Sequence, residues 1–210
     1  MHLFVLGSRR PFVEGLGTLL AERPAVRLVG KTTSPSEAIE TCRRRRPDVA
    51  LVDVGLPPDK AQPASGEAAA AFHQRLTTIR VLAEELNVRV LAVSPVVEDW
   101  LVVKVMMEGA LGFMSRESPL EELIEAVRRV SQGQLVLSQR HFRLLMQRQA
   151  VRLSPRERQL VKLLRQGLSE REIAEQMGLK ANSVRRYIER LRDKLGVRSR
   201  EEIVLMVGQE

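Results

Sequence analysis

Residues Ala181 to Leu195 read ANSVRRYIERLRDKL, and the spacing of their apolar residues indicates the structure of the C-terminal part of the chain. Four apolar residues follow at intervals of four, three and four, namely Val184, Ile188, Leu191 and Leu195. This spacing predicts a helix with one buried face. The opposite face carries Asn182, Arg185, Arg186, Glu189 and Arg190. We therefore expect a helix that is anchored on one side and presents long polar side chains on the other.

Three further helices are expected around this one, over Pro155–Gln166, Glu170–Met177 and Arg200–Val207. The helix expected over Glu170–Met177 and the helix from Ala181 are separated only by Gly178, Leu179 and Lys180. A short turn that contains glycine suits a helix-turn-helix. The sequence therefore predicts an all-helical module at the C-terminus.

The charge distribution favours a polyanionic partner for this module. The chain has a formal net charge of +8, and residues 151–210 hold 14 Lys and Arg against 9 Asp and Glu. Basic charge alone is weak evidence, because many solvated surfaces are basic. The alternative is a solvated charged face on an ordinary helical bundle.

The order of residues separates these alternatives. Three blocks, LSPRER from Leu153, QGLSEREIAE from Gln166 and NSVRRYIERLRDKLGVRSR from Asn182, resemble the LuxR-type helix-turn-helix of NarL/FixJ-type response regulators. The resemblance implies that the helix from Ala181 enters the major groove of double-stranded DNA, where Arg185, Arg186 and Glu189 contact bases. Phosphate contacts are implied for Ser183, Arg190 and Lys194. Lys180 and Asn182 complete the expected DNA-binding set.

The N-terminal part alternates short apolar runs with amphipathic stretches, which is typical of a parallel sheet built from βα units. Five strands are expected, over His2–Leu6, Val26–Val29, Val49–Val52, Val88–Val93 and Leu111–Met114. The fold class is thus α/β, a doubly wound five-stranded parallel domain of receiver-like (flavodoxin-like) type followed by the helix-turn-helix domain. We expect the receiver-like domain over residues 1–132, a linker with a connecting helix (Ser138–Gln149) over 133–152, and the DNA-binding domain over 153–210.

Helix starts carry serine caps. Ser34, Ser118 and Ser154 are each followed by proline and, three residues on, by glutamate; Ser169 and Ser199 precede Glu172 and Glu202 in the same way without proline. Each of these patterns predicts a capping box.

The segment PDVALVDVGLP, from Pro47 to Pro57, resembles the centre of a response-regulator receiver domain. The resemblance makes Asp53 the phosphate-accepting aspartate and Ser94 the hydroxyl residue after the fourth strand. The acids that hold Mg²⁺ in the family align with Gly7 and Ser8, and the family's lysine aligns with Arg116. A pocket with one carboxylate is a poor Mg²⁺ site, so no metal and no cofactor is expected. We hypothesise that Arg116, Arg9 or Arg10 pairs with Asp53 in place of the metal.

These departures favour a sequence-specific transcription regulator that does not depend on phosphorylation and is not an enzyme. The alternative is a conventional two-component regulator phosphorylated at Asp53. A phosphatase-like enzyme using Asp53 as nucleophile is disfavoured, because Gly55 stands where its second carboxylate is expected. An RNA-binding or sigma-factor-like module is also disfavoured, because Tyr187 is the one aromatic residue in the last sixty.

The stretch from Pro57 to Ser94 is about a dozen residues longer than the resemblance leads one to expect. We interpret Asp59–Gly66 as a polar loop and Glu67–Leu86 as an extended helix. The fourth receiver helix, near Glu98–Glu108, is apolar on several faces, which suggests a homodimer. The residues expected at the dimer interface are Trp100, Val103, Met107, Ile203 and Val207, with self-packing of the fourth helix as the alternative.

Two features concern the setting of the protein. The sequence has no leader pattern and no apolar run of about eighteen residues, so a cytoplasmic location without a membrane partner is expected, and RNA polymerase or another regulator is a further candidate partner. The single cysteine, Cys42, falls on an apolar helical stripe and is expected in the core rather than in a redox role.

Overall fold

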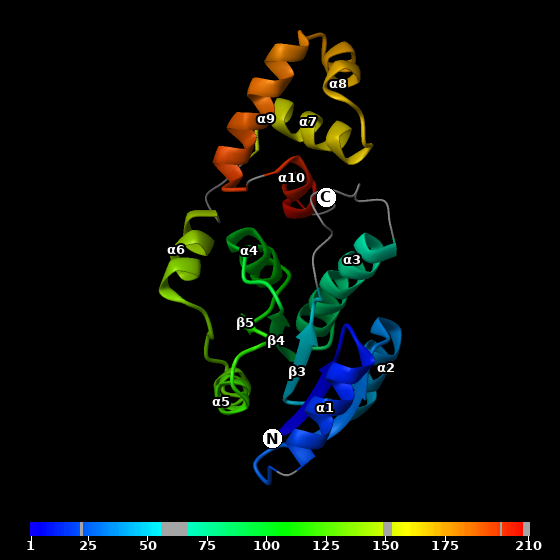
Figure 1. The fold of residues 1–210 in the computed structure, drawn as a ribbon, viewed down its shortest axis with the longest axis vertical. Helices are drawn as coiled ribbons and strands as arrows, with labels where there is room; N and C mark the ends of the chain where they lie inside the picture. Colours follow the sequence, from blue (N-terminus) through cyan, green and yellow to red (C-terminus); the bar gives the residue numbers. More distant parts are fainter. Residues whose placement is uncertain (22, 56–66, 149–152, 198, 208–210) are drawn as a thin grey trace. The chain divides into compact units, whose positions relative to one another are not determined.

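The computed structural model describes residues 1–21, 23–55, 67–148, 153–197 and 199–207. The chain divides into two compact units, residues 1–141 and residues 142–210, and Figure 1 traces both along the sequence. Pro57 and the expected polar loop Asp59–Gly66 lie outside the described residues.

The first unit is built on a five-stranded parallel sheet, as the alternating pattern predicted. Its strands are β1 (His2–Leu6), β2 (Arg27–Thr32), β3 (Val49–Asp53), β4 (Arg89–Ser94) and β5 (Gly112–Ser115). Their order in the sheet is β2-β1-β3-β4-β5, with all pairs parallel. This is the flavodoxin-like order, in which the direction of winding changes between β1 and β3. The predicted fold class is therefore confirmed.

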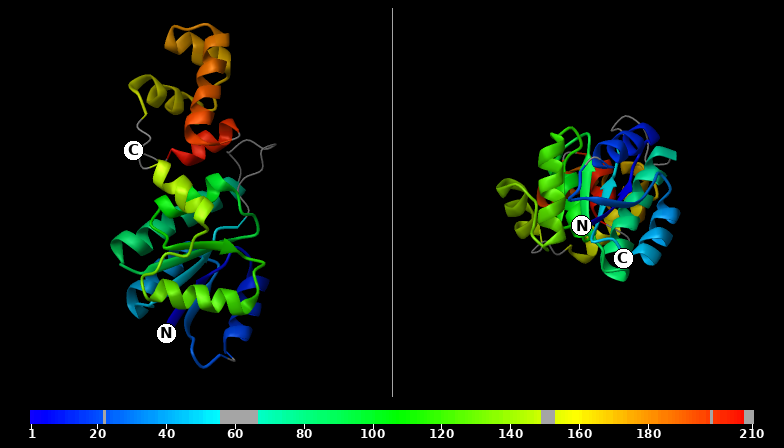
Figure 2. Two further views of the ribbon diagram at one scale, coloured as in Figure 1. Left: turned by 90° about the vertical axis from the view of Figure 1, so that its left-hand side faces the viewer. Right: turned by 90° about the horizontal axis from the view of Figure 1, so that it is seen from below.

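Four helices lie between successive strands and a fifth follows β5, and together they cover both faces of the sheet (Figure 2). They are α1 (Arg10–Ala21), α2 (Pro35–Arg45), α3 (Glu67–Arg80), α4 (Asp99–Met107) and α5 (Leu120–Ser131). Successive strand residues point to opposite faces, so Leu3 and Val5 join a core cluster with α1 and α5. Cys42 of α2 is fully buried, as expected for a core residue, and burial raises the pKa of its thiol to about 12.

The long helix expected over Glu67–Leu86 consists of two consecutive segments. The helix α3 ends at Arg80, and a single wider turn of π-helical type, η1 (Val81–Glu85), continues it. Leu82 on this turn is fully buried.

One predicted helix start is wrong. The side chain of Ser118 does not cap α5, because that helix begins at Leu120 with Pro119 in the capping position. Pro119 has an extended backbone conformation (ψ 145°) instead of lying in the first helical turn. Ser118 is therefore one residue too far from the helix to cap it.

The helix α4 is buried on most of its surface. Trp100 packs against the ring of Phe72 on α3, with ring centroids 6.3 Å apart, and its Nε1 donates to Glu98. Val103 is also buried, whereas Met107 is 57% exposed. Trp100 and Val103 therefore do not belong to an exposed dimer surface, and the alternative of self-packing holds for Trp100.

Lys104, Glu108 and Arg80 form a cluster of ion pairs at the C-terminal end of α4. Lys104 and Glu108 are both buried, and Lys104 Nζ lies 2.7 Å from Glu108 Oε1. The second carboxylate oxygen of Glu108 lies 3.1 Å from Nε of Arg80 on α3. Every charge in this cluster is thus paired, as burial requires.

The first unit extends to the start of the connecting helix, α6 (Gln139–Arg148). The backbone of Val136 pairs with that of β5. At the start of α6, Arg140 and His141 both contact the carboxylate of Asp99 in the first turn of α4, at 2.5 Å and 3.1 Å.

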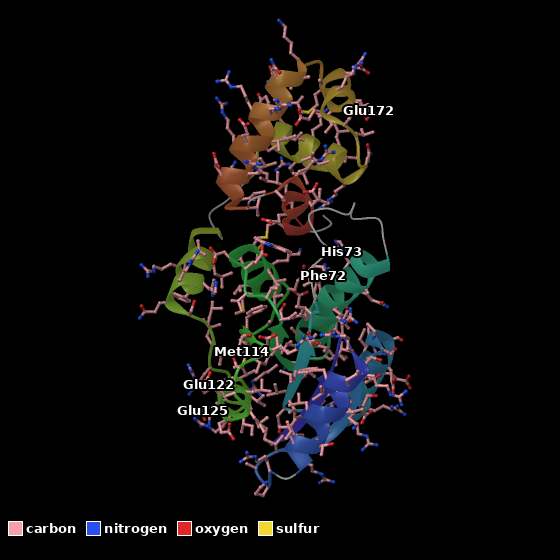
Figure 3. All side chains as sticks on the ribbon, viewed as in Figure 1. Phe72, His73, Met114, Glu122, Glu125 and Glu172 are labelled. Atoms are coloured by element: carbon pink, nitrogen blue, oxygen red, sulfur yellow. The ribbon has the colours of Figure 1, made fainter. Side chains whose placement is uncertain are left out.

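The second unit is all-helical in the residues described, with α7 (Pro155–Arg165), α8 (Glu170–Met177), α9 (Ala181–Leu195) and α10 (Arg200–Met206). Ser154 and Ser169 form the predicted capping boxes with Glu157 and Glu172. Figure 3 labels Glu172 at the start of α8. Gly178 ends α8 in the left-handed conformation (φ 64°), which allows the short turn into α9. In neither unit do the described residues form a helix long and apolar enough to cross a membrane.

Candidate DNA interface and receiver pocket

The carboxylate of Asp53 lies at the carboxyl end of β3, beside the point where the winding of the sheet reverses. It is fully buried. Four donors surround it: Ser8 Oγ at 2.5 Å, Ser8 N at 3.3 Å, Gly55 N at 2.9 Å and Arg116 Nη1 at 3.3 Å. The strand order explains this gathering, because Ser8 follows β1, the neighbour of β3, and Arg116 follows β5.

Arg116 is held from two sides. Its Nη1 bonds Asp53, and its guanidinium carbon lies 5.5 Å from the centre of the Phe12 ring on α1. The side chain is only 13% exposed. Arg9 and Arg10, the other candidates for this pairing, are exposed. Among the three arginines considered, Arg116 is thus the one that neutralises Asp53.

A second arginine reaches the same pocket from α3. Arg75 Nη2 lies 3.5 Å from the carbonyl oxygen of Ser8, and its Nη1 donates to the carbonyl of Ala71. Burial lowers the pKa of the Arg75 guanidinium, and the nearby carboxylate of Asp53 opposes this shift. Its Nε is buried and finds no hydrogen-bond partner among the described residues. Arg75 was not predicted as a pocket residue, because its contact with Ser8 joins positions 67 residues apart.

The residues around Asp53 do not fit the Mg²⁺ that the receiver fold implies. Mg²⁺ needs a near-octahedral shell of oxygens, and the carboxylate of Asp53 is already occupied by the donors described above. At Gly7, one of the two positions of the family's acids, a side chain would lie 2.0 Å from a methyl carbon of Val13. Among the described residues, no group of three His, Cys, Asp or Glu could hold a metal. Ser94, also expected in the pocket, is buried and donates to the carbonyl of Gly55.

The backbone at Gly55 helps to build this arrangement. Gly55 has a φ of +74°, a backbone conformation that residues other than glycine rarely adopt. In this conformation its N–H points to one oxygen of Asp53 while its carbonyl accepts from Ser94. A side chain at this position would also meet Cβ of Ser8 at 3.1 Å.

In the second unit, α9 has the two faces that its sequence predicted. The apolar residues of the stripe are all buried: Val184, Ile188, Leu191 and Leu195. The residues of the other face are exposed: Asn182, Arg185, Arg186, Glu189 and Arg190. Lys180 precedes the helix and is exposed, while Ser183 is half-buried. Side chains tipped with nitrogen extend outward along this helix in Figure 3.

Two cations of this surface are paired with carboxylates of neighbouring helices. Arg185 Nε lies 3.3 Å from Glu170 Oε2, at the first residue of α8. Lys194 Nζ lies 2.7 Å from Glu157 Oε2, in the first turn of α7. Neither pairing was anticipated from the sequence, because no local pattern links residues 15 or 37 positions apart.

The carboxylate of Glu157 also belongs to the capping box of α7. Burial alone would raise the pKa of Glu157, but hydrogen bonds from Lys194 and from the backbone and side chain of Ser154 lower it below its ordinary value. Hydrogen bonds from Ser169 lower the pKa of Glu172 in the same way. Both boxes therefore favour the charged carboxylate.

The helix α10 and the residue after it were predicted to supply two interface residues, Ile203 and Val207, and neither is fully exposed. Ile203 is fully buried, so it is corrected from an interface residue to a core residue of the second unit. Val207 is half-buried and follows the helix, and its carbonyl accepts from Arg165.

A parallel five-stranded receiver fold with an aspartate at the end of β3, followed by a helix-turn-helix unit, defines a DNA-binding response regulator. The family model "Bacterial regulatory proteins, luxR family" matches residues 151–207. The probable transcriptional regulatory protein NarL of Mycobacterium tuberculosis is 30% identical over 95% of this chain and 90% of its own length. The chain therefore belongs to the family of response regulators that includes NarL, with a luxR-family C-terminal domain.

Solved structures of RcsB share the fold. One, from Salmonella enterica serovar Typhimurium, is bound to promoter P1flhDC in the presence of phosphomimetic BeF3- and has a TM-score of 0.75 with 18% identity, covering 97% of this chain and 96% of that one. Another holds two RcsB dimers bound to two parallel DNAs, with a TM-score of 0.70, 18% identity and the same coverage.

Proposed function

We propose that this protein is a sequence-specific transcription regulator whose receiver domain works without phosphorylation. The single observation that carries the second half of this proposal is the pairing of the buried Asp53 carboxylate with Arg116 and with donors from Ser8 and Gly55. An aspartate that attacks a phosphoryl donor needs a free oxygen and a cation beside the transferred group. Here Ser8, Gly55 and Arg116 already use both carboxylate oxygens.

The electrostatics of the pocket support the same conclusion. Arg116 supplies a fixed positive charge, and Arg75 lies close enough for electrostatic attraction to the carboxylate of Asp53. A guanidinium is always charged and cannot be withdrawn as a metal ion can. The pocket therefore places a fixed positive charge against the negative charge of Asp53 without a metal ion.

DNA binding is proposed to take place through the exposed face of α9. Arg185 and Arg186 stand on the first turns of the helix, where a major-groove helix reads base edges. Glu189 can accept a hydrogen bond from a cytosine amino group but repels the phosphate backbone, so it affects sequence preference more than affinity. Ser183, Arg190 and Lys194 are proposed to bind phosphates.

We further propose that the protein acts as a homodimer in the cytoplasm, where its DNA lies. RcsB, whose fold this chain shares, has been solved as dimers on DNA. Among the predicted interface residues, Met107 is exposed and Val207 is half-buried. A two-fold dimer would bind two half-sites about one helical turn apart. RNA polymerase or another regulator stays a candidate partner.

The proposal is tested by exposing the purified full chain to Mg²⁺ and a small phosphoryl donor, with a receiver that retains both acids as positive control. Intact mass measurement is expected to show no added phosphate on this chain. Stoichiometric labelling that disappears in Asp53→Asn would contradict the proposal and establish the conventional alternative.

A further inference from the structure

A carboxylate outside the expected DNA-binding set lies against the helix proposed to read bases. Glu170, the first residue of α8, pairs with Nε of Arg185 at 3.3 Å. We propose that Glu170 is a specificity-determining residue, which orients Arg185 so that its guanidinium reads a guanine. This inference rests on the proposed function, because it names how one base contact is prepared.

The chemistry of the guanidinium explains why the pairing at Nε matters. Arginine recognises guanine with two parallel N–H donors directed at O6 and N7. The two Nη atoms can supply both donors while Nε is bonded elsewhere, because the group carries five N–H donors in a rigid plane. A carboxylate on Nε therefore fixes the plane of Arg185 and leaves its outer edge available for the base.

Fixing the side chain before DNA arrives has a thermodynamic effect. The Arg185 side chain is 66% exposed, so without a partner it samples many rotamers, which must be given up when a base is bound. Ordering a long side chain in advance reduces this loss. The gain applies to the base that fits the fixed orientation, and so it increases discrimination more than overall affinity.

Glu170 is itself well placed to act as the fixed partner. The helix that carries it is capped by Ser169 and Glu172, which bond each other's backbone N–H groups. A carboxylate at the first helical position is also favoured by the helix dipole. The turn at Gly178 then brings the start of α9 against α8.

The other cations of α9 differ from Arg185. Among the described residues, no carboxylate lies within ion-pair distance of Arg186 or Arg190. Lys194 is paired with Glu157, but an ammonium group is a point charge without a fixed plane. Of the guanidiniums expected to read bases, Arg185 alone has a structural partner on another helix within the described chain. We therefore expect the strongest discrimination between bases at the base pair that Arg185 contacts.

The test uses the full-length chain and DNA duplexes selected from a random pool by the wild-type protein. The guanine read by Arg185 is first located as the base pair at which Arg185→Ala loses discrimination. Glu170→Ala is then compared with Glu175→Ala, a matched control on the same helix whose carboxylate pairs with Arg171 at 3.5 Å. Each change removes one negative charge and one exposed ion pair, and both leave the Ser169–Glu172 cap in place, which a thermal melt verifies.

We expect Glu170→Ala to lower discrimination at that base pair about two- to fivefold, the range of an exposed ion pair, while binding to a scrambled duplex is not weakened. Glu175→Ala should keep wild-type discrimination. In the Arg185→Ala background, Glu170→Ala should have no further effect on that base pair.

Two results would overturn the inference alone: wild-type discrimination in Glu170→Ala, or a loss of equal size at base pairs whose discrimination does not depend on Arg185. If the wild-type protein selected no sequence from the pool, the proposed function would fail and this inference with it.

Discussion

Replacing Arg116 by methionine removes the guanidinium that neutralises Asp53 and keeps an apolar side chain over Phe12. Asp53 is fully buried, so loss of its charged partner leaves a desolvated carboxylate. Removing one partner of a buried pair costs about 3–5 kcal/mol when nothing else satisfies the remaining charge. Here Ser8 Oγ, Ser8 N and Gly55 N still donate to it. The loss is therefore close to that of one charged hydrogen bond, about 2 kcal/mol.

The assay follows urea unfolding by the fluorescence of Trp100, which is the only tryptophan of the chain and reports on the first unit. With a slope of about 2 kcal/mol per molar urea, the midpoint should fall by about 1 M. In an Asp53→Asn background the buried charge is absent, so Arg116→Met should cost less than about 1 kcal/mol. An unchanged midpoint, or equal losses in both backgrounds, would refute the reasoning that Arg116 replaces the metal.

Four further changes test other parts of the structure. Arg185→Ala should relax base preference and cost about 1–3 kcal/mol on the selected DNA, measured by fluorescence anisotropy. Lys194→Ala should weaken binding to all sequences alike and flatten the salt dependence by about one unit. Glu108→Ala should destabilise the first unit by about 3–5 kcal/mol, because it leaves buried Lys104 unpaired, and the double change to Lys104→Met and Glu108→Leu should restore most of the loss. Glu157, whose pKa is lowered from 4.5, should stabilise the second unit above that pH and lose this contribution as the pH falls through its lowered value, as urea titrations followed by circular dichroism would show.

Each of these expectations has an outcome that contradicts it. A uniform loss in Arg185→Ala, or a base-specific loss in Lys194→Ala, would reverse their assigned roles. A neutral Glu108→Ala would mean that Lys104 finds another partner. An acid dependence of the second unit that is unchanged in Glu157→Gln would show that the capping box is not its source.

Much of the fold could be predicted from the sequence because it depends on local patterns. The buried strands are short apolar runs, and β3 and β4 begin and end within one residue of the predicted bounds. Helix starts at Ser154 and Ser169 are set by residues three positions apart, and both boxes formed. The cap predicted at Ser118 was wrong because the helix starts one residue later. That start depends on the backbone conformation of Pro119, which the serine-proline-glutamate pattern does not determine.

The parts that could not be predicted depend on contacts between distant positions. The apolar pattern of α4 was interpreted as a surface in need of a partner, yet Trp100 packs on Phe72, a residue in the lengthened segment whose packing no motif describes. Lys104 and Glu108 look like surface residues in sequence, and their burial follows only from the packing of α4. Arg75 and Glu170 were missed for the same reason.

We claim that the pocket around Asp53 is fixed and that the arginine face of α9 binds DNA independently of it. The most direct test measures the affinity of the full chain for its selected duplex with and without Mg²⁺ and a phosphoryl donor, at one salt concentration. Equal dissociation constants are predicted under both conditions and in Asp53→Asn. A donor-dependent tightening that is lost in Asp53→Asn would contradict the claim.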